Sequence, residues 1–280
     1  WCAAENLRLL EEAAQSRGSE FLFVLCPNKS TLCPEAVKSG TPSSDGARFE
    51  ALLTDAGVSH SSLYPALAGR TDCYYRTDSH WNGKGAALAA DTVLRELEMP
   101  DRAVYYGGSF TDGEAHFGDL YRMLYPSGDL FEDAVSYEKG FDFSYDPMFR
   151  SVDDISIYTE NSEASGRLLM FRDSFGASLH SYMADRWGFA VFSRLMPYDL
   201  NLVDREQPDT VVLELVERNI GWICTKAPVF AAPERDISLP EPENNCSITV
   251  LSLDSERMKG YSEISGSVYL MEPDSGSRIY

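Results

Sequence analysis

The sequence predicts an α/β fold in which a mainly parallel sheet lies between two layers of helices, followed by a small β-rich C-terminal segment. Short apolar runs at 20–26, 167–171 and 209–215 are typical of strands buried on both faces of a parallel sheet. Segments with helical spacing alternate with these runs, as they do in α/β domains. The 280 residues, of which 44% are hydrophobic, suffice for one large core with a small appendage.

In the N-terminal half, helices and strands are expected in turn. Apolar residues at helical spacing predict helices over 3–16 and 45–56, with the first strand between them closed by the turn at Pro27. Asn82 precedes an Ala-rich run and is expected to cap a helix that extends to about Leu97, before Met99-Pro100 ends it. Three shorter elements are also expected: a strand from Val58, a capped helix over 61–67 and a strand over 103–106.

Residues 107–165 are rich in Gly, Asp, Ser and Tyr, and only 116–124 shows helical spacing, so we expect a long insertion lying over the sheet with a few strands. Regular patterns then return, with strands over 167–171, 189–192 and 209–215 and helices over 175–187, 199–206 and 216–224. A Pro- and Glu-rich linker follows, after which 247–253 and 261–271 alternate like antiparallel strands. We therefore expect a domain over 1–232 and a β-rich segment over 233–280 that continues beyond the sequence.

Charge and cysteine content exclude several classes of function. The formal net charge of −20 argues against binding to nucleic acid or to anionic lipid. It also argues, more weakly, against a polyanionic substrate, unless Arg70, Arg76 and Lys84 line the site. There is no signal peptide and no apolar run near the roughly 18 residues of a membrane helix. The six cysteines include no CxxC pair; disulfides between Cys26 and Cys33 or between Cys224 and Cys246 stay open.

The stretch 76–85 carries the strongest chemical signal. In an extended segment, positions i and i+2 face the same way, so the carboxylate of Asp78 can reach the imidazole of His80. A carboxylate beside an imidazole raises its basicity and selects its tautomer, which makes it a general base. The alternatives are a solvated loop anchored by Trp81, or a metal site formed by Asp78, His80 and a third ligand.

Ser174 is the best candidate for a nucleophile. It follows an apolar run and precedes a helical pattern, so its hydroxyl would meet backbone N–H groups and the positive end of a helix dipole. The alternative is that Ser174, or Asp173, is only an N-cap. His60, His116 and His180 are weaker candidates, and for His180 a position on the helix surface is expected. Arg218 follows the last buried strand and would steady a substrate oxygen, or else pair with Glu214 or Glu217.

Several of these residues resemble a known family. Thr77 to Asn82, with Gly85-Ala86, resembles the D-x-H-W signature of the DHHW proteins, which belong with the AlgX/AlgJ-type O-acetyltransferases, an SGNH-hydrolase-like group. Four further pieces agree in order, so the resemblance covers about residues 5–225: Pro27-Asn28-Lys29, Gly118-Asp119-Leu120, Asp173-Ser174-Phe175-Gly176 and Glu217-Arg218. The sequence departs from the family at Arg172, where many members have Gly, and at Ser79, which replaces the first His.

The resemblance implies a three-layer SGNH-like domain and a catalytic triad of Ser174, His80 and Asp78, without cofactor or metal. Ser174 would accept an acetyl group and pass it to a hydroxyl of a polysaccharide, with the acetyl supplied through a membrane-bound acyltransferase. Contacts to substrate or oxyanion are expected from Asn28, Lys29, Arg76, Trp81, Arg172 and Arg218.

The resemblance further implies a place at the extracellular face of the membrane or in the cell envelope, with an anchoring segment that precedes the sequence. Alginate itself is a poor expectation for the acceptor, because the chain is strongly acidic. Two other functions stay open. One is a carbohydrate esterase (deacetylase) with the same triad, and the other is a non-catalytic glycan-binding protein, which the 15 Tyr and 4 Trp and the departure at Arg172 would suit.

Overall fold

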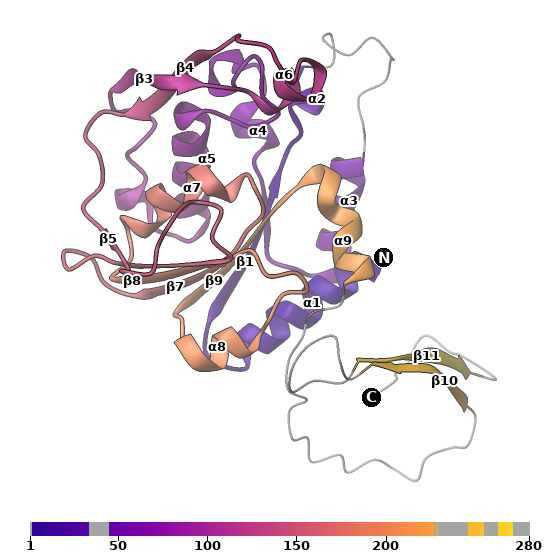
Figure 1. Ribbon diagram of the computed structural model, residues 1–280. Coiled ribbons are helices and arrows are strands. Elements are labelled where there is room, and N and C mark those ends of the chain that lie inside the picture. Colours follow the sequence, from indigo (N-terminus) through magenta and orange to yellow (C-terminus); the bar gives the residue numbers. More distant parts are fainter. Residues whose placement is uncertain (1, 34–44, 227, 229–245, 255–262, 271–280) are drawn as a thin grey trace. The chain divides into compact units, whose positions relative to one another are not determined.

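The computed structural model describes residues 2–33, 45–226, 228, 246–254 and 263–270 (Figure 1). The chain divides into two compact units, residues 1–231 and 232–280. The larger unit holds a seven-stranded sheet and all the described helices. The predicted fold class is confirmed: a mixed α/β unit with a central, mostly parallel sheet, and a separate two-stranded antiparallel sheet.

The central sheet has the strand order β2-β1-β9-β7-β8-β6-β5. Its strands are β1 (Glu20–Cys26), β2 (His60–Ser62), β5 (Ser144–Tyr145), β6 (Ser156–Glu160), β7 (Arg167–Phe171), β8 (Phe189–Ser193) and β9 (Thr210–Val216). The first five in this spatial order pair in parallel, and β6 and β5 pair antiparallel at one edge. Because Cys26 lies beside Val216 and Phe171 beside Leu213, the carboxyl ends of β1, β9 and β7 lie together.

Each face of the sheet is covered by helices (Figure 1). Alternate residues of β1 point to opposite faces, so Leu22 and Val24 belong to one core and Phe21 and Phe23 to the other. The first core includes residues of α4 (Tyr64–Leu67), α5 (Gly83–Glu96) and α7 (Gly176–Ala184). The second core includes residues of α1 (Cys2–Gln15), α3 (Asp45–Ala56), α8 (Asn201–Glu206) and α9 (Ile220–Thr225).

The remaining elements of the larger unit are short. They are α2 (Lys29–Leu32), α6 (Asp119–Leu124), the 3-10 turns η2 (Thr71–Cys73), η3 (Pro100–Arg102) and η4 (Glu217–Asn219), and the antiparallel pair β3 (Phe110–His116) and β4 (Glu132–Tyr137). Within the described ranges, none of the helices combines the length and the apolar character that crossing a bilayer requires.

Three expectations differ from the structure. Residues 103–106 form no strand, and their neighbours Pro100–Arg102 form a 3-10 turn instead. The segment 61–67 is not one helix, because its first residues pair with β1 as β2 and the helix covers Tyr64–Leu67. The insertion does not lie wholly over the sheet, since β6 pairs with β8 and extends the sheet edge. The residues of β6 alternate between half-buried and buried, a pattern that the sequence signal was too weak to reveal.

The smaller unit consists of β10 (Cys246–Asp254) and β11 (Glu263–Leu270), which pair antiparallel with a register shift between Val250 and Ser252. The predicted antiparallel pairing is therefore confirmed. The linker expected at 233–246 lies almost wholly outside the described residues.

Candidate active site

The structure brings Ser174, His80 and Asp78 into one chain of hydrogen bonds. Ser174 lies between β7 and α7, and its Oγ is 2.9 Å from His80 Nε2. The other ring nitrogen, Nδ1, is 2.7 Å from Asp78 Oδ1. With its Nδ1–H donated to the carboxylate, the imidazole presents an unprotonated Nε2 to the serine hydroxyl. This is the arrangement in which a ring accepts a proton from a nucleophile.

The turn that carries Ser174 is held by the buried carboxylate of Asp173. Its Oδ1 accepts a hydrogen bond from the N–H of Phe175 (2.9 Å). Its Oδ2 accepts from the N–H of Val216 (2.9 Å) and from the side-chain amide of Asn219 (2.8 Å). Val216 ends β9 and Asn219 lies in the 3-10 turn that follows it, so the turn that carries Ser174 is tied to the neighbouring strand. A buried carboxylate that accepts three hydrogen bonds holds the local backbone in place and is not free to contact substrate.

Behind this turn lies a second buried acid, Glu214. Its Oε2 accepts from the N–H of Asp173 (3.1 Å), and its Oε1 from the thiol of Cys26 (3.2 Å). Burial first, and then the charge of Asp173, raise the pKa of Glu214 well above its ordinary value. Glu214 therefore supports the turn from the interior, and among the described residues neither Glu214 nor Glu217 forms the ion pair that was the alternative for Arg218.

Both oxygens of the Asp78 carboxylate accept hydrogen bonds. Its Oδ1 accepts from the backbone N–H of His80 (2.9 Å) as well as from the ring, and its Oδ2 accepts from His116 Nε2 (2.9 Å) and the N–H of Asp119 (3.0 Å). Burial by itself would raise the pKa of Asp78, but the hydrogen bonds from His80, Asp119 and His116 lower it well below its ordinary value. Asp78 is thus ionised over the physiological range.

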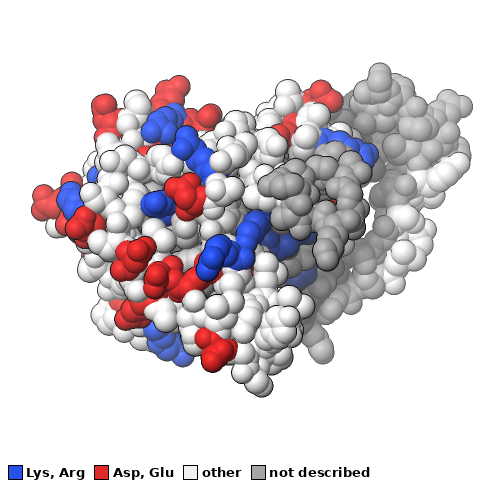
Figure 2. All heavy atoms as spheres, turned by 90° about the horizontal axis from the view of Figure 1, so that it is seen from above, with Lys and Arg blue, Asp and Glu red and all other residues white. Residues whose placement is uncertain are grey.

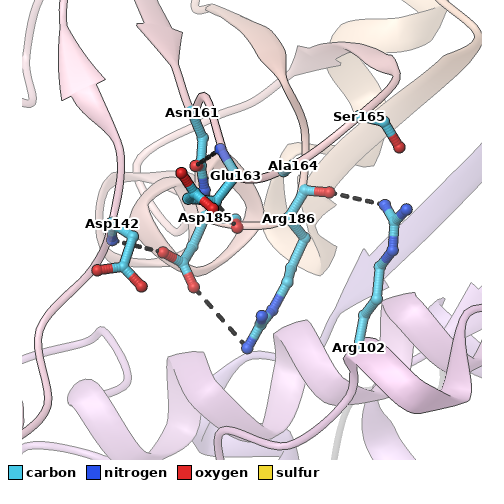
Figure 3. A pocket seen from close by; sticks show the side chains of 8 residues that line it. All are labelled: Arg102, Asp142, Asn161, Glu163, Ala164, Ser165, Asp185 and Arg186. Carbon is cyan, nitrogen blue, oxygen red and sulfur yellow. Dashed lines mark hydrogen bonds and ion pairs between the residues drawn. The ribbon is translucent and has the colours of Figure 1, made fainter.

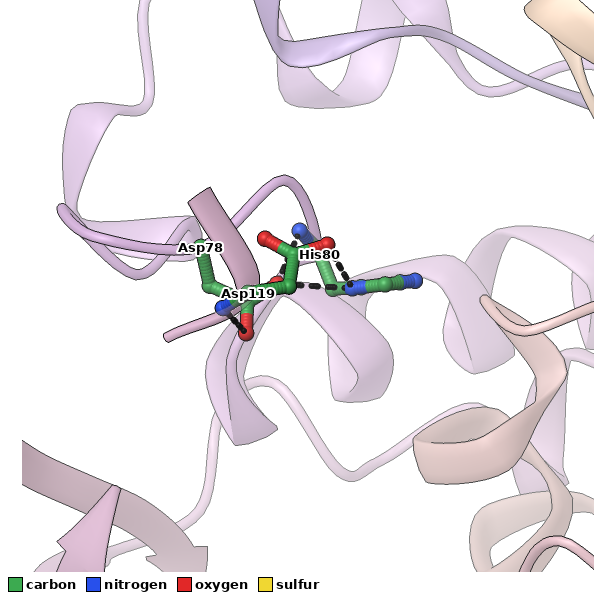
Figure 4. Close-up of side chains that lie close together, drawn as sticks. All are labelled: Asp78, His80 and Asp119. Atoms are coloured by element: carbon green, nitrogen blue, oxygen red, sulfur yellow. Dashed lines mark hydrogen bonds and ion pairs between the residues drawn. The ribbon is translucent and has the colours of Figure 1, made fainter. Parts of the chain in front are cut away.

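Asp119 also reaches the loop that carries His80 (Figure 4). Its carboxylate accepts from the N–H of Ser79 (2.7 Å) and from Ser79 Oγ (2.5 Å), and its Oδ2 lies 3.5 Å from His80 Nδ1. The sequence alone marks His116 only as a weak candidate and assigns no role to Asp119. The signal that could have found them was the Gly118-Asp119-Leu120 motif.

A metal ion was an alternative for this cluster. Asp78, His80 and Asp119 do offer ligand atoms that lie within 4.8 Å of one another. However, N–H donors or ring nitrogens already meet both oxygens of Asp78, and His80 Nε2 meets Ser174. A cation would have to displace this hydrogen-bonded arrangement, so the donor set suits an imidazole base better than a metal.

Trp81 and Arg172 correct the expected list of substrate contacts, because both are buried. The indole N–H of Trp81 donates to the carbonyl of Phe175 (3.1 Å) and to Ser178 Oγ (2.8 Å), which ties the His80 loop to the Ser174 turn. The Arg172 guanidinium donates to the carbonyl of Val152 (2.6 Å), and burial lowers its pKa to about 10. The residue that departs from the family pattern therefore turns its charge inward.

Lys29 also has an internal role. Its ammonium donates to the carbonyls of Tyr75, Arg76 and Asp78, the latter two at 3.0 Å, so it supports the loop that carries Asp78 and His80. Burial is the larger influence on the Lys29 ammonium and lowers its pKa, while nearby acids such as Glu132 act in the opposite direction. Lys29 is half-buried, and a contact with substrate stays a prediction beside this support of the loop.

Asn28, Arg76 and Arg218 remain available at the surface of the site. The guanidinium of Arg218 is exposed, lies 5.1 Å from the centre of the Phe175 ring and donates to Asn28 Oδ1 at 3.3 Å. Arg76 is exposed and uses its backbone N–H to bind Glu132 (2.8 Å). Phe175 touches His80, with ring centres 4.9 Å apart, so Arg218 lies at the edge of the triad.

The remaining side chains singled out in the sequence lie apart from the triad. His180 is buried rather than on the helix surface: its Nδ1–H donates to the carbonyl of Ala177 (2.7 Å) and its Nε2 meets Tyr145 Oη (2.8 Å). His60 bonds the carbonyl of Val58. Cys26 and Cys33 are both free thiols, so that disulfide is wrong, and the side chain of Cys246 lies outside the described residues.

The surface at this end carries both signs of charge. Figure 2 looks onto the end of the larger unit that bears α2 and α6, and Lys and Arg side chains lie across its middle among Asp and Glu. The strong net acidity of the whole chain therefore does not make this face uniformly negative.

A polar pocket of about 310 Å³ lies beyond the other end of α7 (Figure 3). Its charged groups bond one another: Arg102 donates to the carbonyl of Arg186 (2.7 Å), and Arg186 lies 3.8 Å from the carboxylate of Asp185. Ser174 precedes the first residue of α7 and this pocket follows its last. Nine helical residues span roughly 13 Å, so the pocket is separate from the triad.

The chain is similar to known proteins in sequence and in fold. Residues 3–124 match the family described as SGNH hydrolase-like domain, acetyltransferase AlgX. A curated relative, the probable alginate O-acetylase AlgJ of Pseudomonas syringae pv. tomato, is 31% identical over 204 residues. That alignment covers 66% of this chain and 49% of the relative, so the chain spans about half the length of the curated protein it matches.

Solved structures share the fold at low sequence identity. A DHHW family protein from Eubacterium siraeum superposes with a TM-score of 0.64 and 15% identity, over 81% of this chain and 90% of that one. Bacillus cereus PatB1, in a structure with a sulfonyl adduct, gives 0.62 and 17%, over 78% and 87%. Residues 3–124 are thus similar to the SGNH hydrolase-like family of the AlgX type, and the chain shares the fold of these solved structures.

Proposed function

We propose that this protein is an O-acetyltransferase that carries an acetyl group on Ser174 and transfers it to a hydroxyl of a polysaccharide. Two hydrogen bonds support this most directly. Ser174 Oγ lies 2.9 Å from His80 Nε2, and His80 Nδ1 lies 2.7 Å from Asp78 Oδ1. The AlgX-type family match and the AlgJ relative, named as a probable alginate O-acetylase, support acetyl transfer to a polysaccharide in general.

In the first half-reaction, His80 Nε2 takes the proton of Ser174 as Oγ attacks the carbonyl carbon of the acetyl donor. Asp78 stabilises the imidazolium that results. The tetrahedral intermediate collapses with departure of the leaving group, which receives the proton from His80, and acetyl-Ser174 remains. In the second half, His80 removes the proton of a sugar hydroxyl, the sugar oxygen attacks the acetyl carbonyl, and the ester leaves as Ser174 regains its proton.

The oxyanion of each intermediate needs two donors. The N–H of Ser174 is one. The N–H of Phe175 is committed to Asp173, so it is not the second. We assign the second donor to the Asn28–Arg218 pair, which lies at the edge of the triad. Arg218→Ala should lower the rate of acetyl transfer by on the order of 10- to 100-fold while leaving the donor's KM nearly unchanged; a rate equal to that of the wild type would exclude this assignment.

Intact-protein mass spectrometry after incubation with p-nitrophenyl acetate tests the nucleophile. The wild type should gain one acetyl group and Ser174→Ala should gain none. Ser181→Ala is the matched control, since Ser181 is also a serine beside an imidazole. Its Oγ lies 3.4 Å from His180 Nε2, and the other ring nitrogen of His180 bonds a backbone carbonyl. An adduct that persists in Ser174→Ala would refute the proposal, and the absence of any adduct or acetate release would favour a glycan-binding protein.

The acceptor separates a transferase from an esterase. Preformed acetyl-enzyme is mixed with neutral or uronate-containing oligosaccharides, and both acetylated sugar and free acetate are measured. A transferase should yield acetyl-sugar faster than acetate, whereas release as acetate regardless of added sugar would indicate an esterase. We expect neutral oligosaccharides to be better acceptors than alginate fragments, because the chain carries a net charge of −20.

We further propose that the protein works at the extracellular face of the membrane or in the cell envelope, held by an N-terminal segment, with acetyl groups supplied through a membrane-bound acyltransferase. The family match motivates both statements. Fractionation of cells that express the full-length gene tests the first: recovery in the cytoplasmic fraction would contradict it. Loss of polysaccharide acetylation on deletion of a neighbouring membrane acyltransferase gene would support the second, and unchanged acetylation would contradict it.

A further inference from the structure

The loop that carries two members of the triad has no regular secondary structure of its own. Residues 76–80 are a series of bends between η2 and α5. A catalytic base must be held within a fraction of an ångström, so other elements have to supply what a helix or strand would supply. The elements that bond this loop come largely from the insertion, at 116–121 and at Glu132.

His116 fixes the catalytic carboxylate. Its Nε2 donates to Asp78 Oδ2 at 2.9 Å, on the side of the carboxylate away from the oxygen that meets His80 Nδ1. Together with the N–H of Asp119, it gives that oxygen two donors, so the carboxylate cannot rotate without losing both. His116 is itself oriented, because its ring stacks on Tyr75 with centres 3.9 Å apart and planes 15° apart.

Asp119 fixes the backbone of the same loop. Its carboxylate receives both the N–H and the hydroxyl of Ser79, the residue between Asp78 and His80. Glycine at 118 permits this approach, since a Cβ there would lie 2.3 Å from the carbonyl oxygen of Thr77. The N–H of Tyr121 then donates to that same carbonyl at 3.1 Å. The segment 116–121 is therefore docked backbone to backbone on the catalytic loop.

We propose that His116 and Asp119 are positioning residues for the triad. They hold Asp78 and the His80 loop so that the imidazole keeps its Nδ1–H tautomer and presents Nε2 to Ser174. This inference rests on the proposed function, and it extends that function by assigning to the insertion the assembly of the catalytic base. Neither residue touches the reacting atoms, and both act through Asp78 or Ser79.

Two substitutions at His116 separate the hydrogen bond from the packing. His116→Phe keeps an aromatic ring against Tyr75 and removes the donor. His116→Gln keeps an amide N–H that can reach Asp78 Oδ2 and removes the ring. We expect kcat for p-nitrophenyl acetate to fall on the order of 10- to 100-fold in His116→Phe with little change in KM, and to stay within about threefold of the wild type in His116→Gln. His60→Phe is the matched control, because the His60 ring bonds the nearby carbonyl of Val58 and, among the described residues, none of the triad.

Asp119→Asn tests the second contact. Its amide oxygen can accept one of the two Ser79 donors but not both, so an intermediate loss of kcat is expected.

A spectroscopic readout accompanies the kinetics: ¹⁵N NMR of selectively labelled histidine should show His80 as a single Nδ1–H tautomer in the wild type and as a tautomer mixture in His116→Phe.

Full activity of His116→Phe, or equal losses in His116→Phe and His116→Gln, would overturn the inference, because the hydrogen bond would then not matter. An unchanged tautomer of His80 in His116→Phe would also overturn it. Failure of the proposed function is distinguished by the wild type, which would form no acetyl adduct. In that case the NMR measurement still decides whether His116 orients the Asp78–His80 pair.

Discussion

Replacing Asp173 should damage both stability and acyl transfer, because its carboxylate accepts hydrogen bonds from three buried donors around the turn that carries Ser174. In Asp173→Ala the N–H groups of Phe175 and Val216 and the amide of Asn219 lose acceptors that now lie at 2.8–2.9 Å. A buried donor left without a partner costs about 1–3 kcal/mol. With partial relaxation of the site, we expect the free energy of unfolding to fall by about 3–6 kcal/mol.

Asp173→Asn should lie between the wild type and Asp173→Ala. The asparagine oxygen can accept from the donors on one side, while its amide group would face an N–H group on the other. At least one buried donor is therefore left without an acceptor, which costs about 1–3 kcal/mol. Ser174 follows Asp173 directly, and the freed turn should also lower the rate of acetyl-Ser174 formation by on the order of tenfold or more.

Urea unfolding followed by far-UV circular dichroism measures the stability, and the time course of the acetyl adduct at low denaturant measures the rate. Asp199→Ala is the control. The half-buried Asp199 carboxylate accepts from the N–H and the side-chain amide of Asn201, and its loss should cost about 1 kcal/mol or less without affecting the rate. An Asp173→Ala protein within 1 kcal/mol of the wild type, or one that is destabilised but acylates at the wild-type rate, would refute the reasoning.

Three further perturbations have distinct outcomes. Burial lowers the pKa of His180 from 6.5 to about 4, so below pH 6.5 the unfolded chain binds a proton that the folded chain excludes. As the pH falls from about 6.5 towards 4, this group should lower the free energy of unfolding by about 3 kcal/mol. Urea titrations should show that the free energy of unfolding of His180→Phe declines less steeply over this pH range. Gly118→Ala should push the backbone of Thr77 away and slow acetyl-Ser174 formation at least about tenfold with the overall fold retained by circular dichroism; an unchanged rate would mean that the loop tolerates the shift. Asn82→Ala removes the acceptor for the N–H groups of Lys84 and Gly85 and should cost about 1–2 kcal/mol in urea unfolding, whereas Asn82→Asp should lose much less; equal losses would argue against the cap.

Much of the fold could be predicted because the information is local. The apolar run at 20–26 is strand β1 of the main sheet, and the pattern after Asn82 is α5, with the Asn82 side chain accepting from two N–H groups as expected for an N-cap. The weak points were segments without a clear period. The residues of β6 joined the sheet edge although their pattern was obscured by the Tyr- and Asp-rich insertion, and 103–106 formed no strand.

The candidate site divides in the same way. Asp78 and His80 lie two residues apart, so their contact follows from chain geometry, and Ser174 could be singled out from its place between a strand and a helix. The directions of Trp81 and Arg172 could not be inferred, because a side chain at the carboxyl edge of a sheet turns toward solvent or inward according to the elements packed beside it. Both turn inward here: Trp81 donates to the carbonyl of Phe175, in the turn between β7 and α7, and Arg172 to the carbonyl of Val152 in the insertion.

The sequence alone thus determined most of the helices and strands outside the insertion, the helix cap and the residue types available for acyl transfer, since each depends on neighbours a few positions away. The tertiary structure decided which side chains meet. His116 reaches Asp78 across 38 positions, and Asn219 reaches Asp173 across 46, because sheet pairing and the docking of the insertion bring those segments together. Contacts at such separations depend on the packing of whole elements, which local periodicity does not encode.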